Sequence, residues 1–323
     1  MHKILLAKAI NTTALVFIGC VAMVFNEGCT REEMPGIDDE VSGITINLRV
    51  ADPLPGEAGD TQTALLRSVS GAENTVRVVT RSASLGPLPE ESLITNAYVL
   101  FYIIGANDEA TPTAFQSVTA PSAGSDIVID ESQLARLTLG SEYDIYVLAS
   151  IPSSTTTPSL QMTKGQLLAL NEHQFERPAG NPGVSFFGKS SLKYDKGNWK
   201  TLSIEVSRLL ARLDITLTGL KDGQTAAFRI IDQAITVPYN PGNTTTTPPV
   251  HYYTSEPVLK DGIYRTYIYP NYPKKDALYG KARLFLSVLD ADGKVVNVYD
   301  PIVINGGTIE RNKIYEINCS LLP

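Results

Sequence analysis

The chain has 323 residues, of which 43% are hydrophobic and 19% are charged, and its net charge at neutral pH is −7. That length is enough for about two domains with a core each. The basic residues are scattered, which excludes the clustered basic face that nucleic-acid binding requires. Tyrosine is common (15), tryptophan is nearly absent (1), and Thr- and Pro-rich patches recur. This composition is typical of an all-β extracellular module rather than an α/β enzyme.

Residues 1–28 have the pattern of an export signal, with a basic start followed by an apolar stretch. The strongly apolar part is about a dozen residues long, which is short for a membrane-spanning helix of about 20. The stretch ends at Gly28-Cys29, and a small residue directly before a cysteine is what lipoprotein processing requires. We therefore expect a signal peptide at 1–28, acyl chains such as palmitate on Cys29, and a flexible tether at 29–42.

The lipid attachment has alternatives. Asn26 and Glu27 make a poor processing context in front of Gly28, and Gly19-Cys20 is a better local match. Cleavage before Cys20, however, leaves an apolar segment beside the lipid instead of a polar, acidic tether. Lipidation at Cys29, lipidation at Cys20, and secretion or a retained helix without lipid all stay open.

Alternation of apolar and polar residues predicts strands along the first half of the chain. The clearest example is Gly43–Val50, in which Ile and Leu alternate with polar residues. Further strands are predicted at Thr75–Ala83, Ile94–Ile104, in SDIVIDE and YDIYVLAS, and as a pair joined by a turn within SFFGKSSLKYDKGNWKTLSIEV. The Pro-, Gly- and Thr-rich residues 51–64 read as a loop. One helix is predicted at Thr163–Glu176, with Thr163 as its N-cap.

The period-two pattern changes parity in the middle of the mature chain. Apolar residues occupy positions 202, 204 and 206, and then 209, 211, 213, 215 and 217. A change of parity means that the opposite face of the strand becomes buried. It indicates either a β-bulge or passage from one sandwich into another. We place the boundary near Ser207, between an N-terminal β-sandwich at 43–206 and a C-terminal β-sandwich at 207–323.

The second half repeats the same style of short strands and turns. Strands are predicted in AAFRIIDQAITV, IYRTYIYP, ARLFLSVLDADGKVVNVYDPIVI and NKIYEINCSLL, with a hairpin turn at Asp292-Gly293. The predicted fold class is therefore all-β, with two tandem Greek-key β-sandwich domains and a short helix in the first.

Two motifs carry a resemblance to a known family. VSRLLARLDITL and IERNKIYEINCSLLP resemble the domain-linking strand and the closing strand of the fimbrillin-type pilus subunits of Gram-negative gut and oral bacteria. The residues that match are Leu209, Ala211, Arg212, Leu213 and Asp214 in the first motif, and Arg311, Asn312 and Tyr315 in the second. ITNAYVLFYI and YDIYVLASIP resemble core strands of the same family.

The resemblance implies two transthyretin-like sandwiches in a subunit exported as a lipoprotein to the outer membrane and the fimbrium. Such subunits polymerise by β-strand exchange: an Arg-specific protease removes the first strand, and a strand from a neighbour fills the groove. Arg81 and Arg49 are the candidate processing residues, and each also fits a plain solvated position on a strand. The chain stops eight residues after Tyr315, without a spare donor strand, which favours an anchor, tip or accessory subunit over a stalk subunit.

No catalytic motif, metal site or cofactor site is predicted. His173 and His251 have no Ser or Cys motif beside them, DADGKVVN is too poor in acids for an EF-hand loop, and Cys319 alternates with apolar residues as a buried thiol. The expected partners are other fimbrial subunits, the outer membrane, and surface ligands of host or bacterial cells. The alternative function is a surface glycan-binding lipoprotein of a nutrient-uptake system, whose aromatic platform would come from the tyrosines 252, 253, 264, 267, 269, 272 and 279. A secreted glycosidase would need two converging carboxylates, and none stands out.

Overall fold

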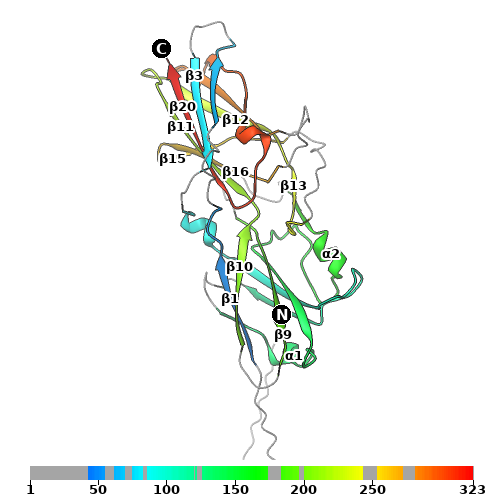
Figure 1. Cartoon of the computed structure of the whole chain (residues 1–323). Coiled ribbons are helices and arrows are strands. Elements are labelled where there is room, and N and C mark those ends of the chain that lie inside the picture. Colours follow the sequence, from blue (N-terminus) through cyan, green and yellow to red (C-terminus); the bar gives the residue numbers. More distant parts are fainter. Residues whose placement is uncertain are drawn as a thin grey trace, which may run out of the picture. The chain divides into compact units, whose positions relative to one another are not determined.

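The computed structural model describes residues 43–54, 62–69, 75–82, 86–119, 121, 126–173, 183–195, 200–242, 253–271 and 281–322. These residues form a protein built mainly of β-strands (Figure 1). The predicted signal peptide, tether, Cys20 and Cys29 lie outside them. Within the described ranges no helix is long and apolar enough to cross a bilayer.

The first sheet has seven strands in the order β5-β4-β7-β9-β10-β1-β6. Their bounds are Ile44–Val50 (β1), Asn96–Ile103 (β4), Ala114–Thr119 (β5), Asp126–Val128 (β6), Glu142–Ala149 (β7), Phe186–Lys193 (β9) and Lys200–Arg208 (β10). Neighbouring strands are antiparallel except β1 and β10, which run parallel along the whole of β1, from Ile44↔Lys200 to Val50↔Val206.

This sheet folds over between β9 and β10, which pair only near one end, from Val206↔Gly188 to Arg208↔Phe186. A side chain does not fit at Gly188, because a Cβ there would lie 2.6 Å from the carbonyl oxygen of Glu205. At the far edges, the backbone N–H of Asp130, just after β6, donates to Gln116 Oε1 of β5 (3.2 Å). The two layers enclose the first hydrophobic core, to which both β1 and β10 contribute.

The second sandwich consists of two sheets that pack face to face. One has six strands in the order β15-β16-β11-β20-β3-β2, and the other has five, in the order β14-β12-β17-β18 with β19 beside β17. The strands are Gln62–Arg67 (β2), Thr75–Ser82 (β3), Ala211–Thr218 (β11), Thr225–Gln233 (β12), Tyr253–Ser255 (β14), Val258–Lys260 (β15), Ile263–Ile268 (β16), Arg283–Leu289 (β17), Val295–Val298 (β18), Ile302–Val303 (β19) and Ile314–Leu322 (β20). A second core lies between these sheets. The predicted all-β fold with tandem β-sandwiches is thus confirmed.

The β2–β3 hairpin comes from the N-terminal part of the chain but belongs to the second sandwich. β3 pairs antiparallel with β20 from Ser82↔Tyr315 to Thr75↔Leu322 (Figure 1), and it buries Val76 and Val78 in the second core. The predicted range 43–206 assigns this hairpin to the first sandwich, and β2 starts inside the predicted loop at 51–64. The boundaries of the two domains themselves stay a prediction.

The chain passes from the first sheet into the second at Leu209 and Leu210, between β10 and β11. Both side chains are buried. Of the two explanations for the change of parity, passage between sandwiches is therefore the one observed.

Four short helices complete the described fold: η1 (Pro89–Ser92), α1 (Glu131–Leu134), α2 (Lys164–Leu168) and η3 (Ile304–Gly307). The helix predicted at Thr163–Glu176 begins as expected, with Thr163 Oγ1 accepting from the N–H of Gln166 (3.2 Å). It ends much earlier, because Asn171–His173 forms strand β8 and pairs with β13 (Thr236–Pro238). Pairing with a distant strand replaces the last helical turns.

Candidate functional site

β1 lies between β10 and β6 in the first sheet, and the space that it occupies there is the β1 groove. Its side chains Ile44, Ile46 and Leu48 are at most 2% exposed and belong to the first core. Its backbone pairs with β10 along its full length. β1 is therefore a structural part of the core rather than a loosely attached leader.

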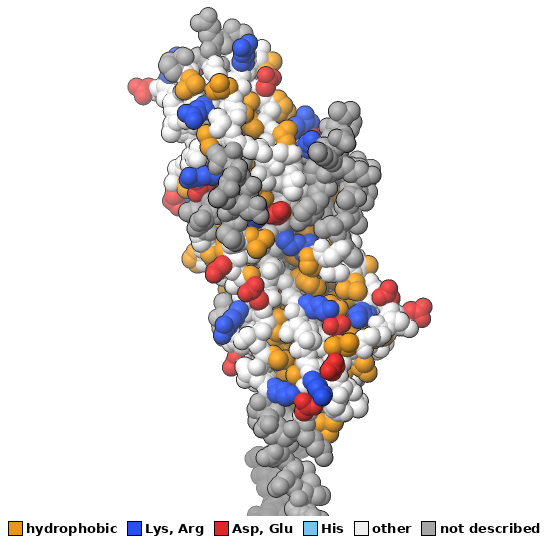
Figure 2. Space-filling view, in the orientation of Figure 1, with side chains coloured by type: hydrophobic (Ala, Val, Ile, Leu, Met, Phe, Trp, Pro, Cys, Tyr) orange, Lys and Arg blue, Asp and Glu red, His pale blue; other side chains and the backbone are white. Residues whose placement is uncertain are grey.

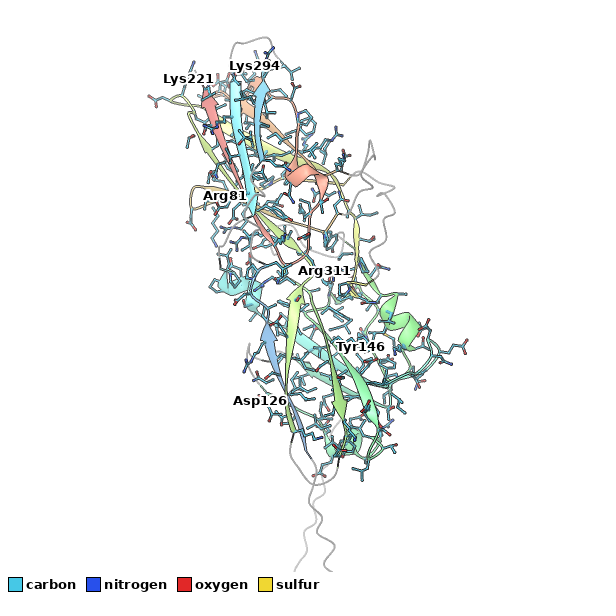
Figure 3. The ribbon with its side chains drawn as sticks, in the orientation of Figure 1. Arg81, Asp126, Tyr146, Lys221, Lys294 and Arg311 are labelled. Atoms are coloured by element: carbon cyan, nitrogen blue, oxygen red, sulfur yellow. The ribbon has the colours of Figure 1, made fainter. Side chains whose placement is uncertain are left out.

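The outer edge of β1 is covered over only part of its length by the described strands. β6 pairs with positions Thr45, Ile46 and Asn47, and Asn47 Nδ2 donates to Asp126 Oδ1 (3.0 Å; Figure 3). Arg49 lies beyond this pairing with an exposed side chain, whose Nε donates to Asn47 Oδ1 (3.3 Å). An external protein can therefore reach the Arg49 side chain.

Arg81 has a different setting. It lies on β3, opposite Glu316 of β20, and its exposed guanidinium forms an ion pair with that glutamate (Figure 3). Its neighbour Thr80 also pairs with Gln62 of β2. The backbone at Arg81 is thus part of a continuous sheet that contributes to the second core.

The two family-like motifs lie side by side, although about a hundred residues separate them in the sequence. β11 and β20 run parallel with Leu213 opposite Tyr315, and the N–H of Asn312 donates to the carbonyl of Leu210 (2.9 Å). The apolar members Leu209, Ala211 and Leu213 are fully buried core residues. The sequence gives no direct sign of this contact between the motifs.

The polar residues of the first motif form a buried ion network on the opposite face of β11. Arg212 Nη1 donates to both carboxylate oxygens of Glu91 (2.9 and 2.8 Å), and Arg265 Nε donates to Asp214 Oδ1 (2.7 Å). Tyr267 OH donates to Glu91 Oε1 (2.6 Å). Glu91 is 2% and Arg212 4% exposed, so these charges are desolvated and depend on each other for compensation.

Burial, together with the hydrogen bond to Glu91, raises the pKa of Tyr267. The phenol therefore remains a proton donor over the whole physiological range. Beside the network lies a partly open pocket with room for about one water molecule, lined in part by Glu91, Arg208 and Arg212. This volume is far too small for an organic substrate.

A second group of hydrogen bonds lies at the junction where the chain passes from β10 to β11, and it joins Arg208 to Asn312. Arg208 Nη1 donates to Asn312 Oδ1 (2.9 Å) and to the carbonyl of Ala51 (2.6 Å), and its Nε donates to the carbonyl of Glu91 (3.0 Å). Burial lowers the pKa of the Arg208 guanidinium from its ordinary value. Asn312 Nδ2 donates to the carbonyl of Asp52 (2.7 Å). The junction thus holds the residues that directly follow β1.

The remaining residues of the closing motif contact other loops. Arg311 donates to the carbonyls of Tyr239 (3.0 Å) and Pro238 (3.1 Å). Tyr315 is fully buried, and its OH accepts from the N–H of Glu310 (3.1 Å). These contacts position the start of β20.

Sequence reasoning missed several residues of these networks. Glu91, Arg208 and Arg265 were not singled out, because a charged residue near a strand end or in a Pro-rich loop normally reads as solvated. The one sequence feature that could have indicated a buried charge is the position of Arg208, where the period-two pattern changes parity.

Glu172 forms a further buried cluster that sequence reasoning missed. Its carboxylate accepts from Tyr239 OH (2.9 Å) and Tyr269 OH (2.8 Å), and Glu172 and Tyr239 are fully buried. Tyr269 is 1% exposed, so it cannot stack against a sugar, and the hydroxyl of half-buried Tyr267 is engaged by Glu91. Tyr252, Tyr272 and Tyr279 lie outside the described residues, as does the side chain of Tyr253. The described part of the predicted aromatic platform is thus largely structural.

The other predicted features have structural roles. Asp290 Oδ1 accepts from the N–H groups of Asp292 (3.1 Å) and Lys294 (2.9 Å), so it closes the DADGKVVN hairpin turn. Cys319 is buried in the second core. The described residues contain no group of three or more potential metal ligands. Positive and negative side chains are interspersed on the face shown in Figure 2, without a basic patch.

No protein-family model matches this chain, and no curated protein matches it. Solved structures share its fold. A fimbrilin from Porphyromonas gingivalis is similar over 87% of this chain and 97% of its own, with 11% identity and a TM-score of 0.52. The C-terminally truncated tip fimbrial protein Mfa3 from the same organism is similar over 87% and 98%, with 12% identity and a TM-score of 0.52. A fimbrial assembly protein from Parabacteroides distasonis is similar over 86% and 89%, with 12% identity and a TM-score of 0.51. At these identities the likeness shows the fold alone.

Proposed function

We propose that this chain is a non-enzymatic structural or adhesive subunit of a cell-surface fimbria of the fimbrillin type, assembled by exchange of β-strands. The observation that carries the proposal is β1, a strand near the chain start that places three buried aliphatic side chains in the first core beside β10. The fold shared with fimbrial proteins supports the same assignment.

Once β1 is detached, the loss of its apolar burial favours replacement by another strand. Withdrawing Ile44, Ile46 and Leu48 would forfeit about 5–9 kcal/mol of apolar burial, which is comparable to the whole stability of a typical domain. A partner strand with aliphatic side chains at alternate positions restores that burial and the backbone hydrogen bonds to β10. An empty groove therefore strongly favours binding of such a strand.

Of the two candidate processing residues, the proposal favours Arg49. Hydrolysis of the Arg49–Val50 peptide bond by an Arg-specific protease, with one water consumed, detaches β1 except for its last residue, Val50. A cut after Arg81 would also detach β2 and nearly all of β3, and would withdraw Leu66, Val76 and Val78 from the second core. The first cut opens one groove, whereas the second disrupts both sandwiches.

The membrane part of the proposal rests on the sequence. The signal peptide at 1–28 directs export, acylated Cys29 anchors the chain in the outer membrane, and residues 29–42 form the tether. With β1 uncut, the lipid stays covalently attached to the folded protein; after a cut at Arg49 it does not. Processing would thus decide between a retained anchor and a subunit released into the fimbrium.

The environment of β20 makes it an integral part of the second sandwich. This C-terminal strand pairs with β11 on one side and β3 on the other, and it buries Tyr315, Ile317 and Cys319. Donating it to a neighbour would dismantle the six-stranded sheet. It is therefore poorly suited to act as a spare donor strand.

The test is the mature N-terminus of the chain purified from its own cells, together with co-fractionation with fimbriae. Acylated Cys29 would identify an anchor, Val50 a subunit processed at Arg49, and Ser82 a cut after Arg81. Palmitate labelling should be lost in Cys29→Ala and kept in the matched control Cys20→Ala. A chain that never co-fractionates with fimbriae in wild-type cells would contradict the proposal.

A further inference from the structure

The segment that follows β1 is held by side chains and backbone from distant parts of the chain. Arg208 donates to the carbonyl of Ala51 (2.6 Å), and Asn312 Nδ2 donates to the carbonyl of Asp52 (2.7 Å). The N–H of Leu54 donates to the carbonyl of Asn312 (2.7 Å). The backbone from Ala51 to Leu54 is therefore fixed by hydrogen bonds that do not involve β1 itself.

The two residues that make these bonds are buried and pre-positioned. Arg208 is 5% and Asn312 3% exposed, and they bond to each other (2.9 Å). Arg208 is further held by the carbonyl of Glu91 (3.0 Å) and by Ser92 Oγ (3.2 Å). Asn312 has a φ of 56°, in the left-handed region that Asn and Gly tolerate best. Both donors are thus oriented by the fold and not by the segment they hold.

β1 itself is held by its ladder with β10 and β6 and by apolar burial. The ladder with β10 continues through Val50 to the N–H of Ala51, which donates to the carbonyl of Val206 (2.9 Å). The bonds from Arg208 and Asn312 begin at the carbonyl of Ala51, two residues after Arg49. A strand detached at the Arg49–Val50 bond would leave behind a segment that the protein still binds.

We infer that Arg208 and Asn312 form a stop at the end of the β1 groove, which keeps Val50–Leu54 in place after a cut at Arg49. The stop restricts an incoming strand to positions 44–49 and prevents it from sliding further along β10. This inference rests on the proposed strand exchange and adds the residues that set its register.

The stop defines the chemistry of the partner segment. The segment is an extended strand of another fimbrial subunit with aliphatic side chains where Ile44, Ile46 and Leu48 now lie, the last of them two positions before the retained Val50. A slip by one residue would turn these side chains to the outer face. A fixed end to the groove excludes that slip in one direction.

The experiment uses the full chain cut under native conditions by an Arg-specific protease, with the new N-terminus at Val50 verified by sequencing. Two synthetic peptides are titrated into the vacated groove: one covers residues 43–49, and the other extends to residue 51. In the wild type both should bind with equal affinity within about twofold, because the chain's own Val50 and Ala51 occupy the extra positions. In Asn312→Gly, which keeps the left-handed backbone, the longer peptide should bind at least about tenfold tighter.

Asn318→Ala is the matched control, since Asn318 lies on β20 but bonds to Thr216 (2.6 Å) instead of the segment after β1. It should behave as the wild type. A readout that needs no cut is hydrogen exchange in the intact chain: Asn312→Gly should speed exchange of the Ala51 and Leu54 amides about tenfold and leave residues 44–49 unchanged. Arg208→Gln should act in the same direction.

Tighter binding of the longer peptide to the wild type would overturn the stop, as would equal binding in Asn312→Gly with unchanged exchange. If neither peptide binds the wild type or any variant, strand exchange itself is refuted, and the proposed stop then has no function. These two failures are distinguishable, because binding of the short peptide to the wild type separates them.

Discussion

Replacing Glu91 by glutamine tests the buried ion network at the junction. Glu91 accepts two hydrogen bonds from Arg212, one from Tyr267 and one from the N–H of Leu88 (2.9 Å). Glutamine keeps the shape but removes the charge and turns an amide donor toward donors. Breaking a buried ion pair costs about 3–5 kcal/mol. Because Arg212 Nε remains 3.2 Å from Asp214 Oδ2, we expect the lower end of that range.

Urea unfolding at 25 °C measures the effect as a lower midpoint with an unchanged slope. The control is Glu256→Gln, which removes an exposed ion pair with Arg229 (3.5 Å) and should change the free energy of unfolding by less than about 1 kcal/mol. If Glu91→Gln costs no more than this control, the network is not desolvated as described. In a double-mutant cycle, Glu91→Gln and Tyr267→Phe should couple by about 0.5–3 kcal/mol.

Three further outcomes follow from burial. Ile46→Ala should destabilise the chain by about 2–5 kcal/mol in urea unfolding, whereas Asn47→Ala, at a half-buried position on the opposite face of β1, should cost less than about 1 kcal/mol. Burial and the Glu91 hydrogen bond raise the pKa of Tyr267. The contribution of Tyr267 to stability should therefore be complete below about pH 10 and be lost above it, because the unfolded chain releases this proton first. Above about pH 10 the stability of Tyr267→Phe should fall less steeply than that of the wild type. Burial raises the pKa of Cys319 to about 12, so a thiol reagent at neutral pH should modify it only as fast as the chain unfolds.

Sequence patterns predicted the strands that alternate cleanly. Gly43–Val50, Thr75–Ala83 and the closing strand match β1, β3 and β20 closely, because period-two burial is a local property. The change of parity at residues 206–209 located the passage between sheets for the same reason. The parallel partner of β1, the strand β10, was not predictable in this way, since it lies about 150 residues further along the chain.

Residues whose role depends on distant partners were missed. Glu91 is 121 residues from Arg212 and 176 from Tyr267, and a glutamate in a Pro-rich stretch carries no periodic signal. The hairpin of β2 and β3 was predicted only in part, because nothing local marks β20 as its neighbour. The helix at Thr163 was overextended, because the pairing of Glu172 with Val237 outweighs local helix propensity.

The charged residues of the two motifs constrain the register of β11 against β20. Leu213 lies opposite Tyr315, and a slip of β11 by one residue would turn Arg212 and Asp214 into the core. Apolar residues at those two positions would tolerate such a slip, whereas Arg212 fits only where it meets Glu91 and Asp214 fits only where it meets Arg265. We infer that the network favours a single register of β11.

The same register fixes the end of the β1 groove. Asn312 lies two residues before the start of β20 in the closing motif. Its N–H donates to the carbonyl of Leu210, which directly precedes β11 (2.9 Å). A shift of β20 against β11 would carry the Asn312 side chain away from Asp52 and Arg208. The alignment of two strands in the second sandwich thus determines where a strand can end in the first.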